Sequence, residues 1–305
     1  KIEHADAGQD LLDIYQLARD ADKRLAAALR RRQAADEDIT QARSQFLPQL
    51  NATAGYEEET QAYERFSQDL ENSGWDATLS LTQPIFRRSN FIAMDKARTA
   101  VDIADLEVLL KQQQLVMDVT EAYFDVLLAQ DEIALVEAEL AAVESQLNRA
   151  ERALEVGTGT QTDVDEARAA YDRVRAQQVA ANNQLEMARE SLRRLTGTYP
   201  EDLAGLTDDF EPRPVKPAET DHWVELAQRH NLEVRLAKQQ DQLARHDVAA
   251  GRSERWPEVD LEARYTHSDG ENQRLSMGPG GSAAVWNQDS VIDTHSIRLQ
   301  LNVPL

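Results

Sequence analysis

The longest regular pattern in the chain is a run of apolar residues spaced alternately three and four positions apart. It comprises Leu115, Val119, Ala122, Val126, Ala129, Ile133, Val136, Leu140, Val143, Leu147, Ala150 and Leu154. A seven-residue repeat sustained over this length predicts a coiled-coil helix. Because no Pro or Gly interrupts residues 89–156, we expect one helix to run through all 68 of them.

A second seam follows the first after a short turn. Gly157, Thr158 and Gly159 supply the helix stop and the turn, Thr162 or Asp163 is the expected N-cap of the return helix, and Gly197 follows its last turn. Helices joined by so short a turn fold back as an antiparallel hairpin. A helix predicted from about residue 10 to residue 45 has the length of the return helix, so the two can lie end to end along the long helix. The second seam comprises Val164, Ala167, Tyr171, Val174, Gln178, Ala181, Leu185, Ala188, Leu192 and Leu195.

Four other segments, near residues 50–56, 75–82, 259–266 and 297–303, alternate between apolar and polar residues. This is the pattern of a strand with one apolar face. Each segment is about as long as a membrane-spanning strand, and no charge falls on its apolar face. A half-buried sheet of a soluble protein is the alternative interpretation. The predicted lipid-facing residues are Leu50, Tyr56, Trp75, Leu79, Leu81, Val259, Leu261, Tyr265, Ile297, Leu299, Leu301 and Val303.

The chain also repeats part of itself at an offset of 209 residues. At this offset ARSQFLPQLNATAGY at residues 42–56 matches GRSERWPEVDLEARY at 251–265, and farther on LSLTQPI at 79–85 matches LQLNVPL at 299–305 at an offset of 220 residues. The repeated unit is helix, strand, loop, strand, long helix, turn and short helix, present once completely and once in part. We expect a second long hairpin beyond Leu305 in the full protein. A removed signal peptide before Lys1 is a second expectation.

Composition narrows the classes of function. The chain has 55 Asp and Glu against 33 Lys and Arg, a net charge of -22 that opposes nucleic-acid binding. The absence of Cys excludes disulfides, thiolate zinc sites, catalytic thiols and a lipidated N-terminal Cys. The chain contains no stretch of 18 apolar residues, so the sequence predicts no transmembrane helix.

Sites for chemistry are also missing from the sequence. The six histidines form no close ligand pair, and the Gly278–Gly281 loop lacks the Lys of a phosphate-binding loop, so we interpret it as an extracellular loop. With no catalytic motif, we expect no enzyme, no cofactor and no metal. The energy for any transport must then come from a partner.

Four strands cannot close a barrel by themselves. An open sheet edge in lipid leaves backbone groups unpaired, so strands that span a membrane here require several chains to share one barrel. Prolines mark the boundaries between helices and strands, and Phe46, Phe86, Phe91 and Trp256 lie near them. Aromatic residues at these positions are typical of an interfacial girdle.

At this point the chain resembles the family of TolC-type outer-membrane efflux proteins. The matching stretches are ARSQFLPQL (42–50), LTQPIF (81–86), TEAYFDVLLAQDEI (120–133), VGTGTQTDVDEARAAYD (156–172) and SLRRLTGTYP (191–200). The resemblance implies a membrane α+β fold. In it, a homotrimer builds a twelve-stranded outer-membrane β-barrel from four strands per chain, and long coiled-coil helices build a periplasmic α-barrel. It also implies a passive conduit of a tripartite efflux or type I secretion system, which works with a periplasmic adaptor (membrane fusion) protein and an inner-membrane pump of RND or ABC type.

In this frame the chain divides into six expected segments. They are an N-terminal periplasmic helix (1–45), a first barrel hairpin (46–86), the coiled-coil hairpin (87–197), an acidic Pro-rich linker in the equatorial region (198–220), the helix of the second repeat (221–253) and a second barrel hairpin (254–305). The expected location is the outer membrane, with outer-membrane lipid around the barrel and most of the chain in the periplasm.

The resemblance also assigns roles to the helical turn. Val156, Gly157 and Thr158 match the turn that binds the adaptor, and Thr162 and Asp163 match a pair that helps to hold the periplasmic entrance shut. The alternative is that Thr162 and Asp163 only cap a helix, and the two roles are compatible.

Two further alternatives concern the charge and the class of protein. Part of the acidic charge lines the lumen and favours cations, or most carboxylates lie on the outer, solvated face. The rival to an export channel is a soluble periplasmic coiled-coil adaptor protein with a small β domain.

Overall fold

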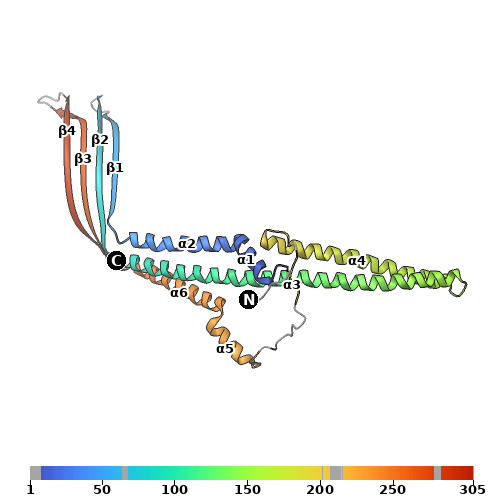
Figure 1. The fold of residues 1–305 in the computed structure, drawn as a ribbon. Coiled ribbons are helices and arrows are strands. Elements are labelled where there is room, and N and C mark those ends of the chain that lie inside the picture. Colours follow the sequence, from blue (N-terminus) through green and yellow to red (C-terminus); the bar gives the residue numbers. More distant parts are fainter. Residues whose placement is uncertain are drawn as a thin grey trace. The chain divides into compact units, whose positions relative to one another are not determined.

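The computed structural model describes residues 8–63, 68–200, 202–206, 214, 216–277 and 283–304. In chain order the elements are α1 (Leu11–Ala21), α2 (Lys23–Ser44), β1 (Gln49–Tyr63), β2 (Gln68–Phe86), α3 (Arg88–Glu155), α4 (Gln161–Thr196), α5 (Thr220–His230), α6 (Leu232–Ser253), β3 (Glu258–Met277) and β4 (Ala283–Asn302) (Figure 1). The chain forms two compact units. The hairpin unit comprises Lys1–Arg32 and Ala104–Leu236, and the sheet unit comprises Gln33–Ile103 and Ala237–Leu305.

The predicted coiled-coil hairpin is confirmed. Helix α3 has 68 residues, as expected, and lies one position earlier than predicted. Gly197 caps the C-terminus of α4, and its φ of 75° is the left-handed conformation that ends many helices. The expected N-cap was wrong: Thr160 caps α4, so the helix begins before Thr162 and Asp163. Ser, Thr and Asp all cap well, so a sequence with three such residues close together does not identify the cap.

Two helices that were predicted as continuous are each broken at one residue. The helix expected over residues 10–45 is divided into α1 and α2 by Asp22, and the helix expected over 221–253 is divided into α5 and α6 by Asn231. Both residues have extended backbone conformations, with ψ of 113° and 127°. The two breaks are 209 positions apart, and the same offset relates the bounds of α1 to α5, of α2 to α6, and the first residues of β1 and β3.

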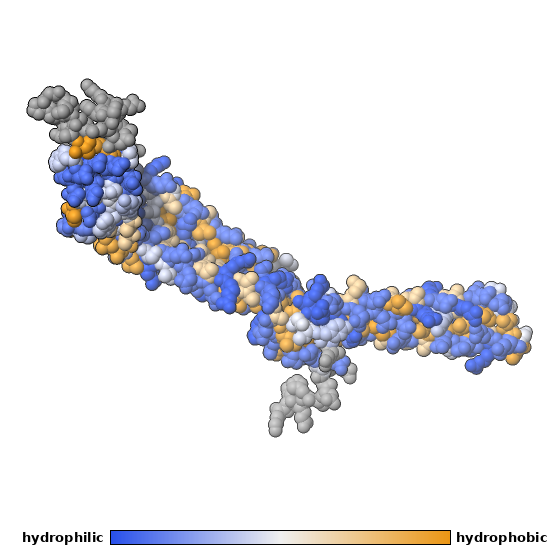
Figure 2. All heavy atoms as spheres, turned by 90° about the horizontal axis from the view of Figure 1, so that it is seen from above, coloured by the Kyte–Doolittle hydropathy of each residue, from blue (hydrophilic) through white to orange (hydrophobic). Residues whose placement is uncertain are grey.

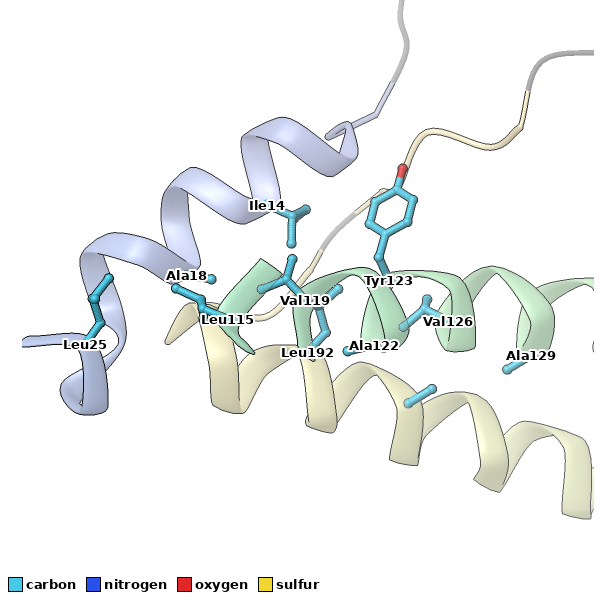
Figure 3. Close-up of a cluster of buried hydrophobic side chains, with 11 residues drawn as sticks. Ile14, Ala18, Leu25, Leu115, Val119, Ala122, Tyr123, Val126, Ala129 and Leu192 are labelled. Atoms are coloured by element: carbon cyan, nitrogen blue, oxygen red, sulfur yellow. The ribbon is translucent and has the colours of Figure 1, made fainter. Parts of the chain in front are cut away.

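The core of the hairpin unit lies where α1 and the start of α2 meet the middle of α3 and the end of α4 (Figure 3). Leu115 and Val119 of α3 are 1% exposed, and Leu192 of α4 is fully buried between α3 and α1. The C-terminal ends of α1 and α4 meet, since a Cβ added to Gly197 would lie 3.7 Å from that of Ala21. Burial declines along the seam, and Leu154 next to the turn is 36% exposed. Among the described residues, the turn end has only the other arm of the hairpin as a neighbour, so its apolar residues gain less from packing.

The sheet is antiparallel throughout, in the order β1-β2-β3-β4 (Figure 1). The strands have 15, 19, 20 and 20 residues, much longer than the alternating segments predicted them to be. Regular pairing is interrupted near the base, where the register of β2 against β3 shifts between Pro84 and Phe86. Proline has no amide hydrogen to donate, so such a shift is expected there.

Candidate channel wall and helical tip

One face of the sheet is apolar in all four strands. Directly opposed residues of antiparallel strands share a face, and the register aligns Leu50, Leu81, Ala263 and Ile297 in one row. The rows on either side carry the other predicted residues, apart from Val303, which follows the end of β4. The sequence therefore identified which residues lie together. Their contact with lipid stays a prediction.

This apolar face is left uncovered within the described residues. Ile297 is 82% exposed, Leu299 69% and Leu301 64%. Burial of apolar surface is worth roughly 25 cal/mol per Å², so a face of this kind requires a partner or an apolar solvent. On the helices, in contrast, the apolar surface is not continuous, and apolar patches are scattered among hydrophilic ones (Figure 2).

A polar block interrupts the apolar face further along the strands. The Asp293 carboxylate accepts a hydrogen bond from the Tyr265 hydroxyl at 2.8 Å and lies 2.8 Å from His267 Nδ1. The rings of Tyr265 and His295 stack at 5.3 Å, and the ring centroids of Trp75 and His267 are 5.0 Å apart. No charge lies on the apolar faces of the predicted segments, but the strands run further, and Asp293 and His267 lie in the extensions. The sequence contained the signal, since both residues keep the period-two position of that face.

The opposite face of the sheet is polar. A row of four threonines, Thr53, Thr78, Thr266 and Thr294, crosses all the strands, and the hydroxyls of Thr78 and Thr266 are 3.1 Å apart. Carboxylates outnumber guanidinium groups on this face among the described residues. The acidic members are Glu57, Glu59, Asp76, Glu258, Asp260 and Glu262, and the basic members are Arg264, Arg274 and Arg298.

The base of the sheet is fixed to the start of α3 by hydrogen bonds. Arg87 donates to both carboxylate oxygens of Asp260, at 2.9 and 2.6 Å. This contact raises the pKa of the Arg87 guanidinium, although partial burial opposes the shift. The amide of Asn90 donates to the Gln45 carbonyl at 2.7 Å. The junction between helix and strand is thus held by charged and neutral hydrogen bonds together.

Aromatic rings gather at the same junction. The rings of Phe46 and Phe91 meet edge to face at 5.1 Å, and the centroids of Phe86 and Phe91 are 6.5 Å apart. Trp256, the fourth predicted member of this group, is 51% exposed. The sequence therefore placed three of the four aromatic residues in one contact group.

The helical tip is a tight turn whose amides donate hydrogen bonds. Gly157 has a φ of 76°, and the amides of Thr158 and Gly159 both donate to the Ala153 carbonyl, at 2.9 and 3.0 Å. Val156 projects from the turn with 72% of its surface exposed. The structure therefore brings the predicted adaptor-binding residues to the end of the hairpin, with an apolar side chain presented outward.

Asp163 belongs to the cap of α4. Its carboxylate accepts hydrogen bonds from the Thr160 hydroxyl at 2.7 Å and the Thr160 amide at 2.9 Å, and these bonds lower its pKa. Thr162 is exposed, and its side chain makes no hydrogen bond within the described part of the chain. The capping role that the sequence analysis left open is therefore real for Asp163, through Thr160, and is not shared by Thr162.

No group of three or more His, Asp or Glu side chains among the described residues is arranged to hold a metal ion. None of the described helices is long and apolar enough to cross a bilayer. The predicted extracellular loop at Gly278–Gly281 lies outside the described residues.

Comparison with known proteins bears on the whole chain. The family model described as "Outer membrane efflux protein" matches residues 14–198. The chain is 33% identical over 272 residues to the outer membrane protein TolC of Vibrio cholerae, which covers 89% of this chain and 61% of that protein. It is 32% identical over 303 residues to the alkaline protease secretion protein AprF of Pseudomonas aeruginosa, covering 97% and 60%. The chain thus spans about 60% of the length of these curated relatives.

Solved structures agree on the fold. The Campylobacter jejuni CmeC outer membrane channel matches with a TM-score of 0.77 at 12% identity, covering 100% of this chain and 66% of that one. The resemblance and the fold class drawn from the sequence are therefore confirmed: strands of a β-barrel type joined to long helices.

Proposed function

The chain belongs to the outer membrane efflux protein family and is an outer-membrane protein with a periplasmic part, and we propose that it forms the wall of a passive export channel. In this proposal β1–β4 supply four strands to a twelve-stranded barrel shared by three copies. The helices line a periplasmic tunnel, and the chain itself catalyses no reaction.

The observation that carries the proposal is the uncovered apolar face of the sheet together with its two free edges. Strands β1 and β4 each have one unpaired edge within the described residues. In lipid each unpaired backbone group costs several kcal/mol, so the sheet is stable there only when neighbouring copies pair with both edges. The polar face, with its row of threonines, then faces the lumen.

The cargo follows from the relatives' names only as a class. AprF is a protease secretion protein, and PrtF of Dickeya chrysanthemi, 28% identical, is another. CmeC is an outer membrane channel. We propose export of polypeptides or of small molecules, driven by an inner-membrane pump of ABC or RND type that reaches the channel through a periplasmic adaptor protein.

In the same proposal the tip of the hairpin is the periplasmic entrance. Val156, Gly157 and Thr158 receive the adaptor, because the turn presents an exposed apolar side chain on a rigid, hydrogen-bonded loop. Thr162 and Asp163 contribute to holding the entrance shut. The Thr162 hydroxyl has no partner in the part of the chain that the structure describes, so it can bind a neighbouring hairpin. The Asp163 carboxylate already serves the helix cap and has to bind both groups at once.

The test is to purify the full-length protein in detergent and reconstitute it in planar bilayers. Stepwise conductance and a trimeric mass in detergent support the channel. A polypeptide that leaves membranes in high salt without detergent, and that is a stable monomer, supports the alternative of a periplasmic adaptor and refutes the channel.

A further inference from the structure

Two segments of the hairpin unit that are distant in sequence, one just before α1 and one after α4, are paired with each other. Gln9 pairs with Leu203 in a parallel bridge, in which the Gln9 amide donates to the Asp202 carbonyl at 2.8 Å and the Ala204 amide donates to the Gln9 carbonyl at 3.0 Å. Gly8 lies so close that an added Cβ would be 2.5 Å from the Asp202 carbonyl oxygen. We call residues 8–9 and 202–204 the clasp. It connects the start of the chain to the linker that leaves α4.

Tyr123 fastens this clasp to the middle of α3. Its ring belongs to the buried core and is 4% exposed, and Figure 3 shows it extending from α3 away from the other core side chains. Its hydroxyl donates to the Ala204 carbonyl at 2.5 Å, and the Gln9 carbonyl lies 3.4 Å away. One phenol therefore reaches both strands of the clasp.

Among the described residues, the clasp makes fewer contacts than the helical core does. The clasp has two backbone hydrogen bonds of its own, and Leu203 packs only partly buried against the core. The chain reaches it from α4 through a turn in which the Thr196 hydroxyl lies 2.8 Å from the Thr198 carbonyl. A segment with few contacts opens more readily than the helical core, so removal of one hydrogen bond has a large relative effect on it.

We propose that the hydrogen bonds of the Tyr123 hydroxyl hold the clasp on α3. In this proposal the clasp opens as a unit of its own while the α3–α4 hairpin stays folded. Tyr123 is then a positioning residue for the point at which the linker leaves the hairpin unit. The proposal is independent of channel function.

The test is hydrogen exchange of the full-length protein in detergent, followed by mass spectrometry, with Tyr123→Phe compared with the wild type. A net hydrogen bond is worth about 1 kcal/mol, so we expect about 5-fold faster exchange in peptides covering residues 8–10 and 202–206. Peptides of the α3–α4 seam should keep their protection. Tyr171→Phe is the matched control, because Tyr171 lies half-buried on that seam and its hydroxyl has no hydrogen bond among the described residues.

A second measurement on the wild type alone uses pH. Burial, together with the negative charge of Asp10, raises the pKa of Tyr123 above 10.0. The hydrogen bond that the Tyr123 hydroxyl donates is therefore intact at pH 9. It is lost as the pH rises through the raised pKa of Tyr123 in the folded state. Exchange in the clasp, corrected for the intrinsic rate and followed by millisecond labelling, should accelerate over that range in the wild type and not in Tyr123→Phe. Unchanged exchange in both experiments, or equal loss of protection in clasp and seam, would overturn the proposal.

Discussion

Asp22 and Asn231, which lie 209 positions apart, cap the second helix of each repeat in the same way. Asp22 Oδ1 accepts from the Leu25 amide at 2.8 Å, and Asn231 Oδ1 accepts from the Val234 amide at 3.0 Å. The two caps differ in their surroundings. The Asp22 side chain is 6% exposed and paired with Arg24, which also reaches Asp118, whereas Asn231 is exposed.

The first prediction is that Asp22→Asn keeps the cap and loses the ion pair. Burial of Asp22 raises its pKa, but the bonds from the Leu25 amide and Arg24 outweigh burial and lower the pKa below 3.8. The carboxylate therefore stabilises the fold above that value, and its contribution is lost as the pH falls through the lowered pKa. We expect Asp22→Asn to cost about 1 kcal/mol at pH 7 and nothing well below pH 4, measured by urea unfolding of the full-length protein.

The matched control is Asn231→Asp in the second repeat. This change places a carboxylate at an exposed cap, where it has neither the burial of Asp22 nor an ion pair like that with Arg24. The free energy of unfolding should therefore change by less than about 0.5 kcal/mol. An equal effect of the two substitutions would show that burial and Arg24 do not matter at Asp22.

The second prediction concerns the gradient of burial along the seam. Leu192→Ala removes a fully buried side chain at the junction of three helices and should cost about 2–5 kcal/mol. Leu154→Ala removes a side chain that is 36% exposed near the turn and should cost less than about 1 kcal/mol. Chemical unfolding followed by helical circular dichroism separates the two. Equal costs would mean that the turn end of the hairpin is covered by a partner in the folded protein.

Uneven success in predicting the elements has physical causes. The bounds of α3 were predicted to within one residue. A long heptad pattern without Pro or Gly predicts a single continuous helix, and Gly157 marks where that helix stops. The breaks at Asp22 and Asn231 were missed, since a one-residue interruption leaves the apolar spacing intact and Asp or Asn is tolerated inside helices. The far halves of the strands were missed because the regular alternation between an apolar face and a polar face is lost there.

The candidate sites, too, were predicted in part and missed in part. The predicted lipid-facing set was chosen from period-two alternation alone, and strand pairing places its members in rows on one face, while their contact with lipid stays a prediction. The block around His267 and Asp293 was missed because the predicted segments did not reach residues 267 and 293, although both residues continue the period-two alternation of that face. The role of Tyr123 depends on two loop segments far away in sequence, for which no local pattern exists.

The third prediction separates capping from gating at the tip. Thr160→Ala removes the hydroxyl that bonds Asp163 and should cost about 0.5–2 kcal/mol of helix stability without opening the closed channel. Asp163→Ala should in addition raise the conductance of the reconstituted channel and admit drugs that the wild type excludes. Thr162→Ala, which breaks no bond within the described residues, tests the second member of the pair. Wild-type conductance and drug exclusion in Asp163→Ala would refute the gating role.

The fourth prediction follows from the excess of carboxylates on the polar face. If that face lines the lumen, cations are concentrated there and the channel prefers them. Reversal potentials under a KCl gradient should show a preference for K⁺. The combined change Glu57→Gln and Asp76→Asn should reduce that preference, whereas Glu58→Gln, on the opposite face, should leave it unchanged. Anion preference of the wild type would refute the assignment.

The fifth prediction tests which face of the sheet contacts lipid. Ile297 and Ser296 are neighbours on β4 whose side chains point to opposite faces, and Ile297 belongs to the central apolar row. A Lys on the lipid face near the middle of the bilayer costs about 2–4 kcal/mol, while a Lys facing a water-filled lumen costs little. Ile297→Lys should therefore lower the yield of folded trimer in the outer membrane and its urea resistance, and Ser296→Lys should not. Because both variants introduce the same charge at adjacent positions, differences in expression or net charge cancel. The opposite ranking would mean that the apolar face is turned inward, and the proposed barrel would then have its two faces exchanged.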